Sequence, residues 1–266
     1  MSAFLNCDYS NIEARLICWL AGQEDALREY QQGVDRYKRM AAMIYGIPEG
    51  SVNEHPQRFL GKTAILGCGY GMGPKKFRES CAKMGYELPA GLEEKAVQSY
   101  RAKHKKVVQY WYALERAMKH AIINKGEVVK LGNIAFQHKD LEGMPFCLLR
   151  LPSGRKLSYP KPRISGESIT YFGHQIGTQW GDVTTYSGKI AENICQGVAA
   201  DVMAHGTHNC ERAGYKIVTL IHDEAVAIHE EGQTAERFEQ LLTALPPWLK
   251  DFPIAAKGKM IPFYKK

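Results

Sequence analysis

Long apolar runs are missing from this sequence of 266 residues. No stretch approaches the roughly 18 consecutive apolar residues that a membrane-spanning helix needs. The first residues also lack the basic region and the long apolar core of a secretory signal. We therefore expect a protein without a membrane segment that stays in the cytoplasm.

The cysteine spacing of a zinc or redox site is absent as well. The cysteines are odd in number, and no two of them have the C-x-x-C spacing of a zinc or redox site. No H-E-x-x-H motif, internal repeat or low-complexity segment occurs. We expect neither disulfides nor zinc, but reduced and mostly buried thiols. These are Cys7, Cys18, Cys68, Cys81, Cys147, Cys195 and Cys210.

Positive charge exceeds negative charge in this chain. The formal net charge is +7 and the pI is about 8.9, which mildly favours a polyanionic partner. Many basic proteins bind no nucleic acid, so charge alone decides little. Lys75 and Lys76, with the lysines and tyrosines of residues 100–112, could track a nucleic-acid strand. A solvated helix face would show the same pattern.

Hydrophobic periodicity and turn residues predict a mixed order of helices and strands. A first strand over 4–7 precedes a large helical region, a hairpin region, one long helix and a final strand pair. Helices are predicted over 12–20, 24–45, 56–66, 75–84, 92–124 and 186–213. Further strands are predicted over 128–136, 146–151, 216–221 and 225–229, and 160–181 is expected to be irregular. This order predicts an α+β fold.

Two aspartates follow predicted strands at opposite ends of the chain. Asp8 follows the first strand, and Asp223 lies in the turn between the last two. A sheet that pairs these strands would bring both carboxylates together. Two such groups could hold a pair of Mg²⁺ ions for phosphoryl transfer, because Mg²⁺ prefers hard oxygen ligands. Taken alone, an aspartate at a strand end is more often a turn or cap residue.

The predicted helix after Pro56 carries a stripe of residues spaced by four. Arg58, Lys62, Leu66 and Tyr70 lie along one slowly rotating face. Two cations one turn apart could clamp a triphosphate, and the aromatic ring could offer a stacking surface. A solvated cationic face is the alternative that spacing alone leaves open.

Four segments together resemble the motifs of family A DNA polymerases, the class of bacterial polymerase I. Residues 8–15 (DYSNIEAR) resemble motif A, and 58–71 (RFLGKTAILGCGYG) resemble motif B. Residues 222–224 (HDE) resemble motif C, and 196–201 (QGVAAD) resemble the helix that precedes it. The similarity runs from about residue 3 to the C-terminus and is greatest to bacteriophage members.

The resemblance implies a right-hand polymerase fold, in which a large helical fingers insertion interrupts an antiparallel palm sheet. It places the palm at 1–24 and 186–266, and the fingers with connecting hairpins at 25–185. The thumb and the exonuclease domain of the family would precede motif A, so we expect both to be absent here. An N-terminal polymerase polypeptide that carries the thumb is therefore an expected partner, unless the chain is a fragment.

The resemblance also implies the catalytic and metal-binding residues. Asp8, Asp223 and the carbonyl oxygen of Tyr9 would hold two Mg²⁺ ions. Glu224 would lie near the metals without being a ligand. Lys62 would contact the incoming triphosphate and is a candidate proton donor to the leaving pyrophosphate.

Further residues are implied to bind the dNTP. Glu13 would pack under the sugar, hydrogen-bond Tyr70 and exclude a ribose 2′-hydroxyl. Two of the nucleotide-binding positions depart from the family pattern: Tyr37 stands where the family often has His, and Leu66 where it usually has Phe or Tyr. The full implied set is Arg58, Lys62, Leu66, Tyr70, Glu13 and Tyr37.

A last set is implied to bind primer–template DNA. Gln196 would approach from the minor-groove side and His222 would touch the primer end, whereas Arg15 would contact the primer backbone or brace the palm. The implied set is Arg15, Gly71, Gln196 and His222, and the basic pattern described above adds Lys75 and Lys76.

Two other functions remain open. A single-subunit RNA polymerase shares the right-hand fold and the two aspartates, although Glu13 and the acid after Asp223 favour DNA synthesis. A non-catalytic remnant that only binds nucleic acid is the second alternative, and the intact Lys62 and Tyr70 argue against it.

Overall fold

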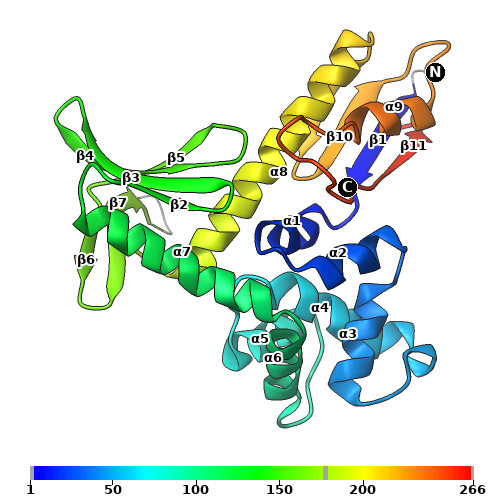
Figure 1. The fold of residues 1–266 in the computed structure, drawn as a ribbon. Helices are drawn as coiled ribbons and strands as arrows, with labels where there is room; N and C mark the ends of the chain where they lie inside the picture. The colour runs from blue at the N-terminus through cyan, green and yellow to red at the C-terminus, as the bar shows by residue number, and fades with distance from the viewer. Residues whose placement is uncertain (1–2, 176–178, 265–266) are drawn as a thin grey trace. The chain divides into compact units, whose positions relative to one another are not determined.

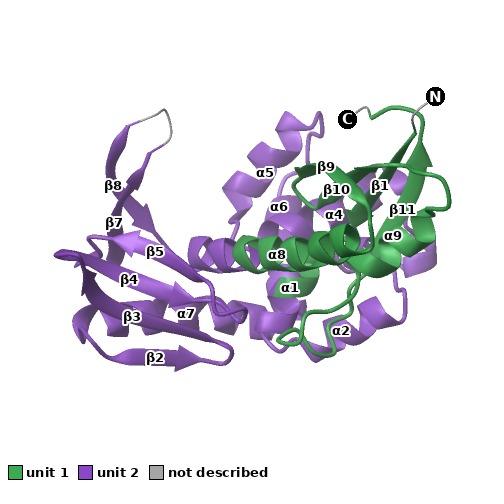
Figure 2. Cartoon of the chain, turned by 90° about the horizontal axis from the view of Figure 1, so that it is seen from above, with its two compact units in different colours: residues 1–16, 196–266 green, residues 17–195 purple. Residues whose placement is uncertain are grey.

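The computed structural model describes residues 3–175 and 179–264, and the chain forms two compact units (Figure 2). Unit 1 consists of residues 1–16 and 196–266, and unit 2 of residues 17–195. The unit boundaries fall within helices α1 (Ile12–Leu20) and α8 (Ser187–Arg212). The mixture of helices and antiparallel sheets confirms the predicted α+β class. In the described part of the chain, no helix is long and apolar enough to cross a membrane.

Unit 1 is built on a four-stranded antiparallel sheet in the order β11–β1–β10–β9 (Figure 1). Its strands are β1 (Phe4–Tyr9), β9 (Lys216–Ile221), β10 (Glu224–Ile228) and β11 (Ala256–Ile261). The first strand of the chain thus lies between two of the last three. This long-range pairing brings motifs from both ends of the sequence into one sheet.

Alternation along β1 determines which side of the sheet carries the core. Leu5, Cys7 and Tyr9 point to one face and are buried. Helix α9 (Ala235–Leu242) lies across the sheet (Figure 1), and the Tyr9 hydroxyl donates to the Leu242 carbonyl oxygen over 2.6 Å. A Cβ atom on Gly206 would lie 2.6 Å from that hydroxyl oxygen. Only glycine lets α8 approach Tyr9 so closely.

The first part of unit 2 is helical. Its helices are α2 (Glu24–Gln31), α3 (Arg36–Tyr45), α4 (Phe59–Cys68), α5 (Pro74–Lys83), α6 (Leu92–Lys103) and α7 (Lys105–Ile123). The helix predicted over 24–45 is interrupted, because Gly33 takes a left-handed φ of 68° and Asp35 caps a new helix. The helix predicted over 92–124 is interrupted at His104, whose φ and ψ are not helical.

Arg36 in α3 contacts His104, the residue at which the helix predicted over 92–124 is interrupted. Its Nε donates to Glu29 over 3.0 Å, and its Nη2 lies 2.5 Å from Nε2 of His104. Since Nδ1 of His104 faces the Tyr100 carbonyl oxygen at 3.1 Å, we assign the ring proton to Nδ1 and the accepting role to Nε2. Burial, followed by the charge of Arg36, lowers the pKa of His104 to about 4. A neutral imidazole therefore accepts the Arg36 hydrogen bond.

The second part of unit 2 contains two antiparallel sheets. The first joins β2 (Val128–Leu131), β3 (Ile134–Leu141), β4 (Met144–Arg150) and β5 (Lys156–Pro160), in that order. The second joins β6 (Arg163–Ser165), β7 (Ser168–His174) and β8 (Trp180–Thr185).

The prediction that 160–181 is irregular was therefore wrong where the structure describes it; residues 176–178 lie outside the described residues. Its glycines and prolines made the short strands hard to predict, and Gly166, with a φ of 58°, lies in the turn between β6 and β7. The expectation of buried thiols is confirmed, since all seven cysteines are free and buried.

Candidate active site

Asp8 and Asp223 lie at the same end of the unit 1 sheet. Strand β1 pairs with β10 so that Asp8 is opposite Glu224, and the Tyr9 amide donates to the Asp223 carbonyl oxygen over 2.9 Å. The predicted pairing of the strands that carry the two aspartates is confirmed. Asp8 is exposed and Asp223 is half-buried, so both carboxylates are accessible to a ligand.

A tight turn places His222 and Asp223 at the sheet edge. These two residues alone separate β9 from β10, and His222 adopts a left-handed φ of 57°. A non-glycine residue in this region costs about 1 kcal/mol or more and is commonly found at functional sites. The hairpin therefore holds His222 exposed beside Asp223 at a conformational cost.

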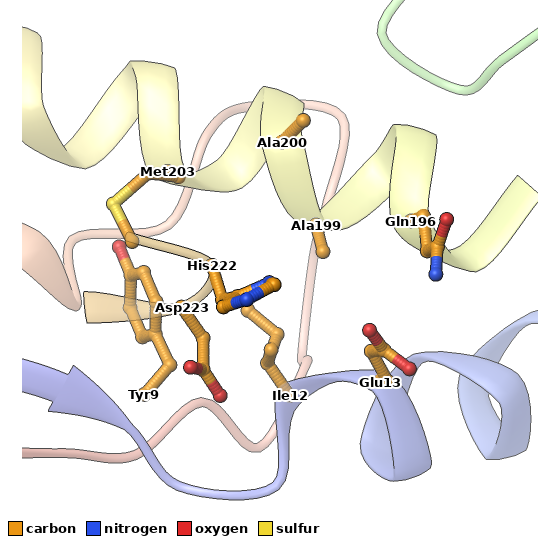
Figure 3. A pocket seen from close by; sticks show the side chains of 9 residues that line it. All are labelled: Tyr9, Ile12, Glu13, Gln196, Ala199, Ala200, Met203, His222 and Asp223. Carbon is orange, nitrogen blue, oxygen red and sulfur yellow. The ribbon is translucent and has the colours of Figure 1, made fainter. Parts of the chain in front are cut away.

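A pocket of about 490 Å³ opens at this edge within unit 1 (Figure 3). It brings together predicted residues from three segments: Glu13 from α1, Gln196 from α8, and His222 with Asp223 from the turn. In Figure 3 the side chains of Glu13 and Gln196 point toward one another. The complete lining is Tyr9, Ile12, Glu13, Gln196, Ala199, Ala200, Met203, His222 and Asp223.

Sequence reasoning missed the apolar wall of this pocket. Ala199, Ala200 and Met203 follow Gln196 at spacings of three, four and seven along α8. This spacing marks one helix face, so the signal was present in the sequence. The small alanine side chains keep the pocket wide beside Gln196.

Glu224 is held by two other polar groups. Its carboxylate accepts hydrogen bonds from the Asn6 amide and from the Tyr264 hydroxyl, the latter over 2.8 Å. Among the described residues, no group of three or more His, Cys, Asp or Glu side chains could hold a metal ion. Two carboxylates suffice for Mg²⁺ when water and substrate phosphates supply the other ligands. Asp8, which is exposed, and Asp223, which is half-buried, fit that mode of binding.

Arg15 is directed into the protein. It is 8% exposed, its Nε donates to the Ser10 carbonyl oxygen over 2.7 Å, and its Nη1 donates to the Pro253 carbonyl oxygen over 2.5 Å. These bonds tie α1 to the segment before β11. Of the two roles predicted for Arg15, the contacts are those of a brace.

In unit 2, α4 presents the predicted stripe. Arg58 immediately precedes the helix, Lys62 and Leu66 are exposed, and Tyr70 follows the helix end half-buried. The opposite face of α4 buries Leu60, Ala64 and Ile65. The helix thus leaves its predicted functional face accessible and uses the other for the core. Tyr37, at the start of α3, lies beneath Arg58, with 5.2 Å between the guanidinium carbon and the ring centroid.

A second pocket, of about 330 Å³, lies at the end of α4 within unit 2. It collects the predicted residues Leu66, Tyr70, Gly71 and Lys76, whereas Lys75 does not line it. Sequence reasoning missed Tyr186 as a wall of this pocket. The complete lining is Leu66, Gly67, Tyr70, Gly71, Met72, Gly73, Lys76, Tyr186 and Glu192.

A glycine allows this pocket to form. A Cβ atom on Gly188 would lie 2.1 Å from the Tyr70 carbonyl oxygen, so α8 could not approach the α4–α5 turn with any larger residue. Glu13 belongs to unit 1 and Tyr70 to unit 2, and the hydrogen bond predicted between them stays a prediction.

The sequence of this chain matches the profile of a known protein family. The sequence profile of DNA polymerase family A matches residues 1–137, more than half of the chain. The chain belongs to DNA polymerase family A. The predicted family is thus confirmed.

Relatives of this family A chain include a phage enzyme. The DNA polymerase of Bacillus phage SP02 is 34% identical over 271 residues, which cover 99% of this chain and 41% of that protein. The thermostable DNA polymerase I of Thermus aquaticus is 32% identical over 93 residues, or 35% of this chain and 11% of that protein. The family A chain therefore spans about two fifths of the phage relative.

The fold has a solved counterpart. The POL domain of Pol1 from M. smegmatis, determined in complex with DNA primer–template and dNTP, superimposes with a TM-score of 0.66. The match covers 98% of this chain and 39% of that one at 16% sequence identity. At this identity the likeness shows a shared fold.

Proposed function

We propose that this chain carries the catalytic part of a template-directed DNA polymerase. The reaction joins the α-phosphorus of a dNTP to the 3′-hydroxyl oxygen of a primer and releases pyrophosphate. The pairing of β1 with β10 carries the proposal, because it brings Asp8 and Asp223 to one accessible sheet edge. The family membership of the chain supports the same reaction.

Asp8, Asp223 and the Tyr9 carbonyl oxygen are the groups that would hold two Mg²⁺ ions. When bound, the ions lower the pKa of the attacking hydroxyl and neutralise the pyrophosphate. Asn6 and Tyr264 keep the Glu224 carboxylate occupied, which supports a role near the metals rather than as a ligand.

The accessible stripe of α4 would bind the dNTP. Arg58 and Lys62 would contact the triphosphate as charge-assisted donors, and Lys62 would protonate the leaving pyrophosphate. Leu66, Tyr70 and Gly71 would form the surface for the nascent base pair, with Lys76 of the same pocket close to DNA. The Tyr37 hydroxyl could donate one hydrogen bond near the phosphates.

Unit 1 would select the sugar and hold the primer end. Glu13 would block the space that a ribose 2′-hydroxyl needs, and Gln196 and His222 would touch the terminal base pair from the same pocket. Lys75 would contact the template strand. Arg15 would act as a brace. Unit 1 is then the palm and unit 2 the fingers with its hairpins.

The proposal extends to a partner. We propose that a thumb-bearing polypeptide grips the duplex together with this chain, which spans 41% of the SP02 polymerase. Fewer neutralised phosphates would make DNA binding by this chain alone weak and steeply salt-dependent.

Primer extension tests the function. The chain is assayed alone and with a thumb-bearing polypeptide, using Mg²⁺ and either dNTPs or NTPs. With dNTPs we expect extension when the thumb-bearing polypeptide is present and slow or no extension by the chain alone, and we expect none with NTPs in either setting. Asp8→Ala and Asp223→Ala should abolish it while circular dichroism shows an intact fold. Asp140→Ala, which removes an exposed hairpin carboxylate, is the matched control and should retain full activity.

The outcomes separate the alternatives. Extension with NTPs would favour an RNA polymerase, and no extension in either setting would favour a remnant that only binds nucleic acid. Full activity in either aspartate variant would contradict the two-metal assignment.

A further inference from the structure

Arg58, the first cation of the α4 stripe, is held by groups outside α4. Its Nε donates to Asp35 Oδ2 over 2.8 Å and lies 3.5 Å from Glu54 Oε2. Its guanidinium lies over the Tyr37 ring. Asp35 and Tyr37 both belong to the start of α3, so the arginine is fixed from a neighbouring helix.

Asp35 divides its two oxygens between two tasks. Oδ1 accepts from the backbone amides of Tyr37 and Lys38, each over 3.0 Å, and thereby caps α3. Oδ2 accepts from Arg58. Burial is the largest single influence and opposes ionisation, but the hydrogen bond and the charge of Arg58, together with the hydrogen bonds from the Lys38 and Tyr37 amides, outweigh it and lower the pKa of Asp35. The carboxylate is therefore charged at neutral pH.

Helices α3 and α4, which the Asp35 carboxylate joins, are packed closely together. A Cβ atom on Gly61 would lie 2.1 Å from the Tyr37 carbonyl oxygen, so the backbones of α3 and α4 are in direct contact. The close contact therefore fixes Asp35, at the start of α3, relative to Arg58, at the start of α4. A hydrogen bond across such a junction sets the direction of the arginine side chain.

The contacts within the described chain engage Nε and the ring face of Arg58, and they leave Nη1 and Nη2 for a ligand. An arginine with a fixed fork loses less entropy when it binds a phosphate than one that must be ordered first. We propose that Asp35 is a positioning residue for triphosphate recognition, and that it directs the terminal nitrogens of Arg58 toward the incoming nucleotide. This inference rests on the proposed function.

Glu54 provides a matched control. It also faces Nε of Arg58, but at 3.5 Å, with its side chain 62% exposed and paired with Lys38 over 2.9 Å. Asp35 is closer and only 34% exposed. An exposed pair contributes little. Removing the Glu54 charge should therefore leave nucleotide recognition unchanged.

Three variants separate the two tasks of Asp35. Asp35→Ser keeps a good helix cap, but its side chain is too short to reach Arg58. Asp35→Ala removes both contacts. Glu54→Gln removes a charge near the same nitrogen. The two Asp35 variants should share one defect in nucleotide binding, and Asp35→Ala, which also lacks the cap, should melt at a lower temperature than Asp35→Ser.

The test measures kcat and KM for dNTP in primer extension, together with equilibrium binding of dATP and of inorganic tripolyphosphate by calorimetry. Asp35→Ser should raise KM and both dissociation constants about tenfold, as expected for loss of one charge-assisted hydrogen bond, and should leave kcat within about twofold. Glu54→Gln should match the wild type.

A double-mutant cycle with Arg58→Ala completes the test. If Asp35 acts through Arg58, Asp35→Ser should add nothing in the Arg58→Ala background. An unchanged or lowered KM in Asp35→Ser, a fall in kcat alone, or equal effects in both backgrounds would overturn the inference. The binding arm keeps the two proposals distinguishable, since failure of the wild type to extend primers would refute the polymerase while Asp35 is still tested by the dissociation constants.

Discussion

Gly61→Ala should destabilise the protein, because Gly61 is where α3 and α4 touch. An alanine Cβ would lie 2.1 Å from the Tyr37 carbonyl oxygen and 2.9 Å from the Ala41 amide nitrogen. Ordinary contacts begin near 3.4 Å. Both obstructing atoms belong to the backbone of α3, so a side-chain rotation cannot relieve the clash, and the helices must separate by roughly 1 Å.

The size of the effect is a balance of two contributions. Forcing a methyl group into a close-packed contact typically costs about 1–3 kcal/mol, and a clash with backbone belongs at the upper end. Alanine in place of glycine inside a helix returns about 1 kcal/mol of intrinsic propensity. We expect Gly61→Ala to lower the free energy of unfolding by about 2 kcal/mol, from a cost near 3 less that gain.

Gly67→Ala on the same helix is the matched control. Its Cβ would lie 2.9 Å from Cε of Met72, the far end of a flexible side chain that can move away. The gain in helix propensity is the same, so the free energy of unfolding of the Gly67→Ala protein should equal that of the wild type or exceed it by up to about 1 kcal/mol. Urea unfolding followed by circular dichroism measures both. A Gly61→Ala protein as stable as the Gly67→Ala protein would refute the backbone-contact argument.

The remaining predictions concern pH and sugar choice. The pKa of His104 in the folded protein is about 4, below its ordinary value of 6.5. The unfolded chain therefore takes up the proton first as the pH drops. The free energy of unfolding should fall between about pH 6.5 and about pH 4. Thermal melts at pH 7 and pH 5 should show this loss, and His104→Gln should flatten it; an equal slope in both proteins would contradict the assignment. Glu13→Ala should raise ribonucleotide incorporation at least about tenfold by removing a steric block. An unchanged ratio of NTP to dNTP use in single-nucleotide extension would place the sugar selection elsewhere.

Local patterns were enough to predict several parts of the site. The stripe of Arg58, Lys62 and Leu66 follows from helical periodicity, since neighbours along a helix face are set by spacing alone. The positions of Asp8 and Asp223 at strand ends follow from apolar runs that stop beside them. The family itself could be predicted because its motifs are short and contiguous.

Other contacts join residues far apart in the chain, and no local pattern indicates them. Glu224 is bound by Asn6 and Tyr264 from opposite ends of the sequence. These contacts depend on the register of β1 between β10 and β11, which backbone hydrogen bonding and burial of one sheet face determine together.

The sequence by itself determined the family and the α+β class, and it predicted which residues form the metal and nucleotide sites, because each depends on residue type at short spacing. Only the tertiary structure decided that Arg15 faces inward and that Asp35 shares its carboxylate between a helix cap and Arg58. The physical reason is that packing selects one partner for each polar group from many that are equally compatible with the local sequence.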